Sequence, residues 1–282
     1  MDRPSESGAV DRDGPGQSDT SGESAFRVVG IAVVLAVVAL LVPTVALGIV
    51  VAVVLAVDPP GAIAVLGLAV VAQFAWFIAV GLGYLRRRGL DWTQIKAYVG
   101  VERPSLRDLA LILGTWVAML VVAGIVATLV TEVLPELLGT GSQETAENQS
   151  LDIIDENPEL VGVGIAFMFL VVGPAEETLF RGVIQSRLRE RFSVVPAILL
   201  ASAVFASAHV VALAGQDPVA VANTIVILFV PSLGFGALYE YTGNVVVPTL
   251  LHGFHNSMIV LAIYVTTVSG AESAAIAGAL GV

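Results

Sequence analysis

The chain has 282 residues, of which 56% are apolar and 13% are charged, and its mean hydropathy is +0.90. This composition excludes an ordinary soluble domain and indicates a membrane protein with several spanning segments. The net charge of −11 argues against a nucleic-acid partner, because phosphates require a basic surface. The sequence contains no cysteine, which excludes disulfides, thiolate metal sites and a cysteine nucleophile.

The amino-terminal part divides into a polar tail and two apolar segments. Residues 1–27 are rich in Gly, Ser, Pro and Asp and have little to bury, which predicts a disordered tail. Residues 28–85 contain two apolar runs, 28–57 and 61–84. Each exceeds the ~20 residues that a helix needs to cross a ~30 Å hydrocarbon layer. We therefore expect two transmembrane helices, joined by a turn at 58–61 that contains two prolines.

The next segments differ sharply in charge. Residues 86–107 carry six of the 13 basic residues and predict a cytoplasmic linker with a short amphipathic segment, because Lys and Arg collect on the cytoplasmic side. Residues 109–130 predict the third span. The loop 131–159 contains eight acidic residues and no basic one, so we expect it on the outer side.

Four further apolar segments complete the predicted all-α transmembrane bundle of about seven helices. The first of them begins near Leu160, and the other three cover 194–213, 219–239 and 244–268. All basic residues then fall on the inner side, which predicts a multi-pass cell-membrane protein with a cytoplasmic amino terminus. Residues 108–268 form the predicted catalytic core, and residues 269–282 form a carboxyl-terminal tail. Continuous apolar runs lack the alternation of a transmembrane β-barrel.

The fourth predicted span ends in a group of charges. Residues 160–172 carry no charge, and Glu176, Glu177 and Arg181 follow within a few positions. Ionisable groups at membrane depth are costly, so they indicate a functional site. Glu177 and Arg181 are spaced i, i+4 with the acid first, which predicts a buried ion pair. Adjacent residues on a helix point about 100° apart, so we expect Glu176 to face a cavity and to have a task different from that of Glu177.

The first histidine of the chain lies in the fifth predicted span. His209 and Glu176 lie 16 residues on either side of an expected turn at 192–193. At ~1.5 Å per residue, both would lie roughly 24 Å along their helices from that turn, at one level. Phe205 precedes His209 by one helical turn and is expected to pack against the imidazole.

The seventh predicted span carries the other two histidines. His252 and Asn256 are spaced i, i+4, and two such donors side by side suit a developing oxyanion. His255 lies at the edge of the same face and is expected to be a supporting or substrate-side residue. A purely structural role in helix contacts is the alternative for each of these side chains.

Three motifs in this order resemble the CPBP intramembrane proteases, also called the Abi or type II CAAX prenyl protease group. They are Glu176-Glu177-x-x-x-Arg181, Phe205-x-x-x-His209 and His252-x-x-x-Asn256. The likeness covers about residues 160–260. It implies a cytosol-facing intramembrane endopeptidase that cuts a membrane-anchored protein or a prenylated peptide within the lipid bilayer.

The resemblance also implies roles for individual residues. Glu176 would activate water with help from His209, and His252 and Asn256 would polarise the scissile carbonyl and hold the oxyanion. Glu177, Arg181, Phe205 and His255 would support them.

Two questions stay open at this level. Glu176, His209 and His252 could form a zinc site with one open position, as the label metalloprotease often given to the family suggests, or the chemistry could be metal-free acid–base catalysis. The alternatives to a protease are a proton- or ion-coupled transporter, since buried Glu and His make proton relays, and a non-catalytic membrane scaffold. A transporter would be expected to show broken helices in related halves, which the sequence lacks.

Overall fold

The computed structural model describes residues 23–57, 61–148 and 152–269, and these ranges contain helices and turns but no strands. Seven helical segments in them are long and apolar enough to cross a membrane, which confirms the predicted all-α bundle. The seven segments are Ala25–Val57, Ala64–Arg87, Leu106–Leu138, Pro158–Arg189, Val194–Val211, Pro218–Thr242 and Val246–Ser269. The predicted disorder of residues 1–22, the predicted turn at 58–60 and the predicted tail beyond residue 269 lie outside the described residues.

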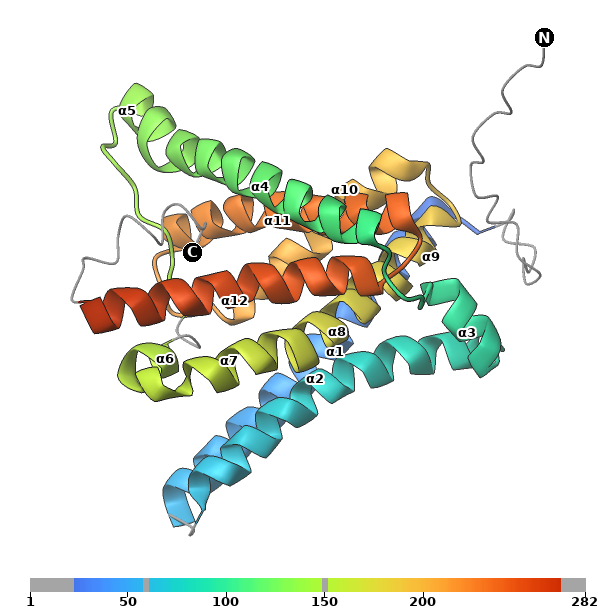
Figure 1. The fold of residues 1–282 in the computed structure, drawn as a ribbon, viewed down its shortest axis with the longest axis horizontal. Coiled ribbons are helices and arrows are strands. Elements are labelled where there is room, and N and C mark those ends of the chain that lie inside the picture. Colours follow the sequence, from blue (N-terminus) through green and yellow to red (C-terminus); the bar gives the residue numbers. More distant parts are fainter. Residues whose placement is uncertain (1–22, 58–60, 149–151, 270–282) are drawn as a thin grey trace.

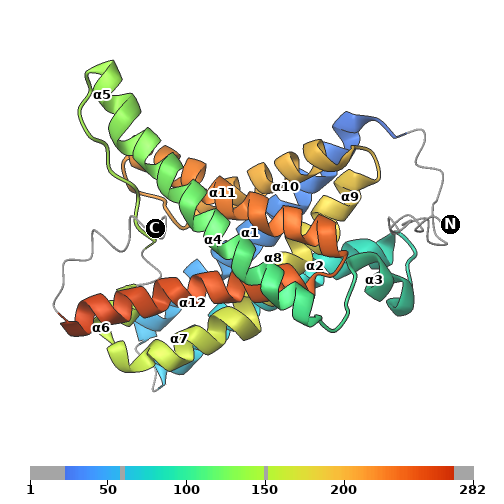
Figure 2. The same cartoon turned by 45° about the horizontal axis from the view of Figure 1, so that its top comes forward.

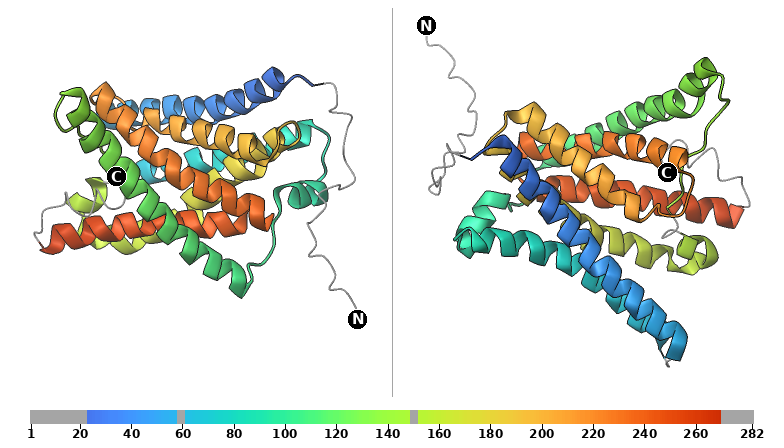
Figure 3. Two further views of the ribbon diagram at one scale, coloured as in Figure 1. Left: turned by 90° about the horizontal axis from the view of Figure 1, so that it is seen from above. Right: turned by 180° about the vertical axis from the view of Figure 1, so that it is seen from behind.

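The helices form two splayed arms around a central group (Figure 1). The long helices are α1 (Ala25–Val57), α2 (Ala62–Arg87), α4 (Leu106–Thr128), α10 (Val194–Ala208), α11 (Pro218–Thr242) and α12 (Val246–Ser269). Helices α1 and α2 pack against each other as one arm, and α4 crosses α11 and α12 as the other (Figures 1 and 3). The central group consists of α10, α11, α12 and the span that contains the two glutamates.

The shorter elements mark the two ends of the bundle. Helices α3 (Trp92–Val99) and α9 (Ser186–Arg189) lie at the right-hand end, whereas α5 (Leu134–Leu138) and α6 (Asp152–Glu156) lie at the left-hand end (Figures 1 and 2). Helix α3 is the predicted amphipathic segment of the linker. It begins at the capping box of Asp91 and Gln94, which satisfies two backbone N–H groups.

Two helices are longer than predicted at their ends. Helix α1 begins at Ala25, inside the predicted tail, because the backbone N–H of Arg27 donates to the carbonyl (3.0 Å) and the hydroxyl (3.2 Å) of Ser24. The third span continues beyond residue 130 through the π-helical segment η2 (Leu129–Val133) into α5, where a loop was expected.

Pro135 explains that π-helical segment. Proline has no N–H to donate to the carbonyl four residues earlier, and its ring crowds that carbonyl. Here that carbonyl belongs to Thr131, and the backbone N–H of Gln143 donates to it at 2.7 Å. The helix therefore widens around Pro135 instead of ending, and the loop that follows is tied back to it.

A cluster around Glu190 joins the elements at the end of the bundle that contains α3. Arg88 donates two hydrogen bonds to the Glu190 carboxylate, at 2.7 and 3.0 Å, and the Tyr98 hydroxyl donates a third at 2.7 Å. Arg187 pairs with both Glu190 and Glu23. Burial raises the pKa of Glu190, but the hydrogen bonds from Arg88 and Tyr98 and the nearby cations outweigh burial, and the pKa lies below its usual value.

Candidate active site

Two π-helical segments flank the glutamates. Helix α8 (Gly173–Glu177) contains both acids, with η5 (Met168–Val172) before it and η6 (Thr178–Gln185) after it. Pro174 cannot donate to the carbonyl of Leu170, so the helix widens over η5 as it does before Pro135. Such π-helical turns are rare and often occur at functional sites. They also alter the rise per residue between Glu176 and the turn, so the expected depth of ~24 Å, which assumed a continuous α-helix, does not apply.

Two glycines let α12 approach this helix closely. A Cβ atom on Gly173 would lie 3.0 Å from the carbonyl oxygen of Thr249 on α12. A Cβ atom on Gly253 would lie 2.7 Å from Cδ1 and 3.0 Å from Cα of Phe169. A side chain at either position would crowd the facing helix, and the contact places His252, the neighbour of Gly253, beside the glutamates.

Glu177 lies at the centre of a buried network. Its Oε2 accepts from Nε of Arg181 at 3.1 Å, which is the ion pair predicted from their spacing, and its Oε1 lies 2.8 Å from Nδ1 of His252. Arg181 also donates through Nη2 to the hydroxyl of Ser232 at 2.9 Å. Glu177, Arg181 and Ser232 are fully buried. Since an unpaired charge in such a place would be strongly unfavourable, each ion here stabilises the other.

Glu176 approaches the opposite side of the same imidazole. Its Oε2 lies 3.8 Å from Nε2 of His252, and its side chain is 14% exposed, whereas that of Glu177 is fully buried. The two acids, which were expected to have different tasks, thus contact the same histidine from opposite sides. The angle between adjacent helical positions is the reason: the two carboxylates diverge and the ring lies between them.

Aromatic rings fix the histidines. Phe235 stacks on His252 with centroids 4.7 Å apart and planes 14° apart. Phe205 packs against His209 at 4.9 Å, as predicted, and also against His252 at 5.9 Å. Nδ1 of His209 lies 3.0 Å from the carbonyl oxygen of Phe205. His209 therefore reaches the cluster through the Phe205 ring, and no hydrogen bond or ion pair joins it to Glu176 within the described ranges.

The remaining two predicted residues lie on α12. Nδ2 of Asn256 lies 3.8 Å from the Met168 sulfur, which is a weak acceptor. His255 is buried, 6.4 Å from the Phe235 ring, and its Nδ1 has no hydrogen-bond partner in the part of the chain that the structure describes. Neither side chain has a hydrogen bond to His252 there.

The predicted zinc ligands are not brought together. Glu176 approaches His252, whereas the contact of His209 with this group is through the Phe205 ring, which packs against both histidines. Among residues 23–57, 61–148 and 152–269, no three His, Asp or Glu side chains are arranged to hold a metal ion. The side chains of this structure therefore do not fit a zinc ion at the predicted set.

Sequence reasoning missed Ser232 and Phe235, which lie on α11 and complete the network. The available signal was the stretch Pro231-Ser-Leu-Gly-Phe-Gly, where a hydroxyl and two glycines interrupt an apolar span. Small and hydroxyl residues in a span often mark helix contacts. The stretch gave no indication of which helix would supply the partner.

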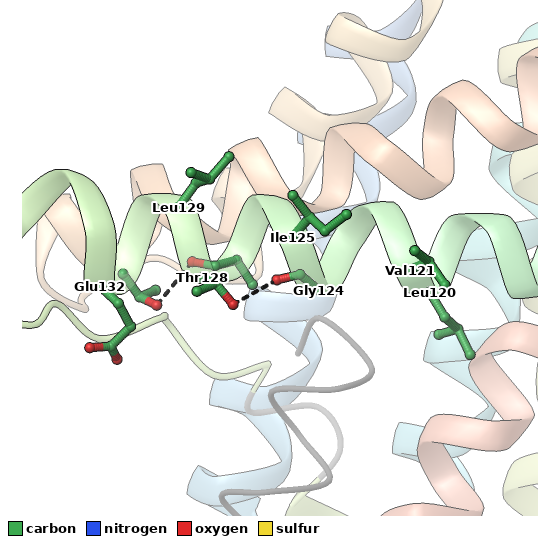
Figure 4. A pocket seen from close by; sticks show the side chains of 9 residues that line it. Leu120, Val121, Gly124, Ile125, Thr128, Leu129 and Glu132 are labelled. Atoms are coloured by element: carbon green, nitrogen blue, oxygen red, sulfur yellow. Dashed lines mark hydrogen bonds between the residues drawn. The ribbon is translucent and has the colours of Figure 1, made fainter.

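A hollow elsewhere in the molecule does not involve these residues. It has a volume of about 870 Å³ and is lined by positions 120–132 of α4 and η2. Figure 4 shows Glu132 at one end and Leu120 and Val121 at the other, with Thr128 bonded back to the carbonyl of Gly124. None of the predicted site residues lines it.

The fold and the buried cluster define a polytopic membrane protein that encloses a Glu–Arg–His network between its spans. Residues 158–258 match the family model described as type II CAAX prenyl endopeptidase Rce1-like. This match contains all three motifs and confirms the resemblance to the CPBP and CAAX proteases. The match supports a function as a CAAX-type intramembrane protease, which would act on a membrane-associated substrate. Comparisons with curated proteins and with solved structures give no match.

Proposed function

We propose that this protein is an intramembrane endopeptidase in which Glu176 activates the water that hydrolyses a peptide bond of a membrane-anchored protein or prenylated peptide. The observation that carries the proposal is the approach of Glu176 and Glu177 to opposite nitrogens of His252. Glu177 is fully buried and paired with Arg181, which suits a fixed support. Glu176 is partly exposed, and its ion pair within the described residues is with the imidazole, which suits a base that must reach water.

His252 and Asn256 would bind the carbonyl oxygen. Glu177 fixes the imidazole through Nδ1, so that Nε2 is the nitrogen facing Glu176 and the reacting atoms. In the ring form that carries a proton on each nitrogen, Nε2 donates to the developing oxyanion. The Asn256 amide donates to the Met168 thioether, a weak acceptor that an oxyanion would readily replace.

His209, which packs against Phe205, would complete the site. The contact of its Nδ1 with the Phe205 carbonyl favours a proton on Nδ1 and leaves Nε2 as an acceptor. In that form it can accept a hydrogen bond from the attacking water and orient it, when substrate binding brings His209 and Glu176 together. Glu176 takes the proton of that water as the O–C bond forms and passes it to the amine nitrogen as the C–N bond breaks. The proposed reaction includes no metal-dependent step, because the described side chains do not fit a metal ion.

The proposed orientation places the end with α3 and the Glu190 cluster in the cytoplasm. Residues 86–107, which link α2 to α4, and residues 187–191 at α9 lie at this end and carry nine of the 13 basic residues (Figure 1). The opposite end carries the acidic loop between α4 and α6. This asymmetry follows the positive-inside rule.

The test is peptide hydrolysis in liposomes, with prenylated and unprenylated peptides and metal analysis of the same sample. Glu176→Gln should lower kcat at least ~100-fold, because a general base contributes about that factor or more. Glu159→Gln, an exposed acid at the start of the same span, is the matched control and should retain wild-type activity. Wild-type hydrolysis by the Glu176 variant would overturn the assignment, and solute flux without hydrolysis would favour a transporter.

A further inference from the structure

The guanidinium of Arg181 has one nitrogen without a hydrogen-bond partner among the described residues. Nε binds Glu177 at 3.1 Å and Nη2 binds Ser232 at 2.9 Å. Nη1 has no hydrogen-bond partner among the described residues, although the side chain is fully buried. A buried guanidinium donor without an acceptor is costly, and such groups are nearly always satisfied in folded proteins.

Gln185, one helical turn after Arg181, has the complementary unsatisfied atom. Its Nε2 donates to the carbonyl oxygen of Gly236 at 2.9 Å. Its Oε1 is an acceptor without a partner within the described ranges, and this side chain is also fully buried. A donor and an acceptor, each lacking one partner, therefore lie on the same helix one turn apart.

Both atoms face the same space beside Gly236. The point where a Cβ atom on Gly236 would stand lies 2.8 Å from Oε1 of Gln185 and 3.5 Å from Nη1 of Arg181. The two atoms are thus close enough to be bridged by a single oxygen atom. Cγ2 of Ile198 lies 3.2 Å from the same point, so an oxygen atom there has room only because Gly236 has no side chain.

We propose that one buried water molecule binds between Nη1 of Arg181 and Oε1 of Gln185, beside Gly236. The water accepts a hydrogen bond from the guanidinium and donates one to the amide oxygen, which satisfies both groups. It completes the hydrogen bonding of Arg181, which holds Glu177, which in turn holds His252. Gln185 and Gly236 are then positioning residues for the network, and this site does not depend on the proposed reaction.

The direct test is an experimental structure of the purified protein at a resolution that shows ordered water. We expect one solvent peak within hydrogen-bond distance of Nη1 of Arg181 and Oε1 of Gln185. A structure that shows the two side chains bonded directly to each other, or no solvent between them, would overturn the proposal.

A stability comparison of variants at position 236 tests the same site independently. Gly236→Ala should displace the water and lower Tm by several degrees. Serine is larger than alanine and a poorer helix former, yet its hydroxyl can take the place of the water. The Tm of Gly236→Ser should therefore lie above that of the alanine variant. Gly114→Ala on α4 is the control, because its Cβ atom meets nothing within 4 Å, and its Tm should be unchanged or higher. A serine variant no more stable than the alanine variant would point to steric exclusion alone and would contradict a bound water.

Discussion

Nδ1 of His252 lies 2.8 Å from Oε1 of Glu177, a residue 75 positions earlier in the chain. This contact orients an imidazole on the seventh span from a carboxylate on the fourth. The same carboxylate is paired with Arg181, so the arrangement is an arginine–carboxylate–histidine chain inside the bundle. Each member depends on the others, because all three side chains are buried and a lost partner would leave a buried polar group unsatisfied.

Removal of the central carboxylate should therefore be severe. We expect Glu177→Gln to lower the free energy of unfolding by about 3–5 kcal/mol, because it leaves the buried Arg181 charge without its counter-ion. Thermal unfolding in detergent measures the change. Combining Glu177→Gln with Arg181→Met should restore part of the loss, since the unpaired cation is removed as well. A double variant less stable than the single one would contradict this electrostatic explanation.

The glycine contact between the two helices gives a second prediction. Gly253→Ala should force α12 away from Phe169, because the added Cβ atom would lie 3.0 Å from a backbone atom that cannot move aside by rotation. We expect a lower Tm together with loss of hydrolysis, since His252 would move away from Glu176. Gly30→Ala on α1, where a Cβ atom meets nothing within 4 Å, should leave hydrolysis unchanged and Tm unchanged or higher. Unchanged activity in the Gly253 variant would show that the close approach is not required.

The stacking of Phe235 on His252 predicts a smaller, graded effect. Phe235→Leu keeps an apolar side chain but removes the ring, and should lower the free energy of unfolding by about 0.5–1.5 kcal/mol beyond the loss of buried area. Because the imidazole would then be held on one side only, kcat should fall more than KM rises. Steady-state kinetics and thermal unfolding separate the two effects. A variant with lower stability and normal kcat would show that the ring only fills space.

The Glu190 cluster predicts how stability depends on pH. The pKa of Glu190 lies below its usual value in the folded protein, so its contribution is fully present above the unfolded pKa of ~4.3 and disappears as the pH falls through the lower folded value. Tm should therefore fall as the pH is lowered below about 4.5. In Glu190→Gln, Tm at neutral pH should be lower and this part of the acid dependence should be absent. Identical pH profiles for the two proteins would contradict the assignment.

The sequence predicted the helical class and the positions of the spans well, because both depend on local composition. Long uncharged runs can be stable only across a bilayer, and their ends are marked by basic residues and prolines. It also predicted the pairing of Glu177 with Arg181 and the packing of Phe205 on His209, since both pairs are neighbours on one helix at i, i+4 spacing. The catalytic roles of Glu176, His209, His252 and Asn256 stay predictions.

Contacts between helices could not be predicted from local composition and spacing. Three contacts depend on how the spans cross: the approach of Glu176 and Glu177 to His252, the stacking of Phe235 on His252, and the packing of Phe205 against His252. Those crossings are fixed by Gly173 and Gly253 and by the widened turns around Pro174. The sequence by itself determined which residues are buried in the bilayer and which lie on one helical face, because periodicity is a property of a single helix. Only the tertiary structure decided which faces meet, because close packing between helices depends on the shapes of side chains far apart in the chain.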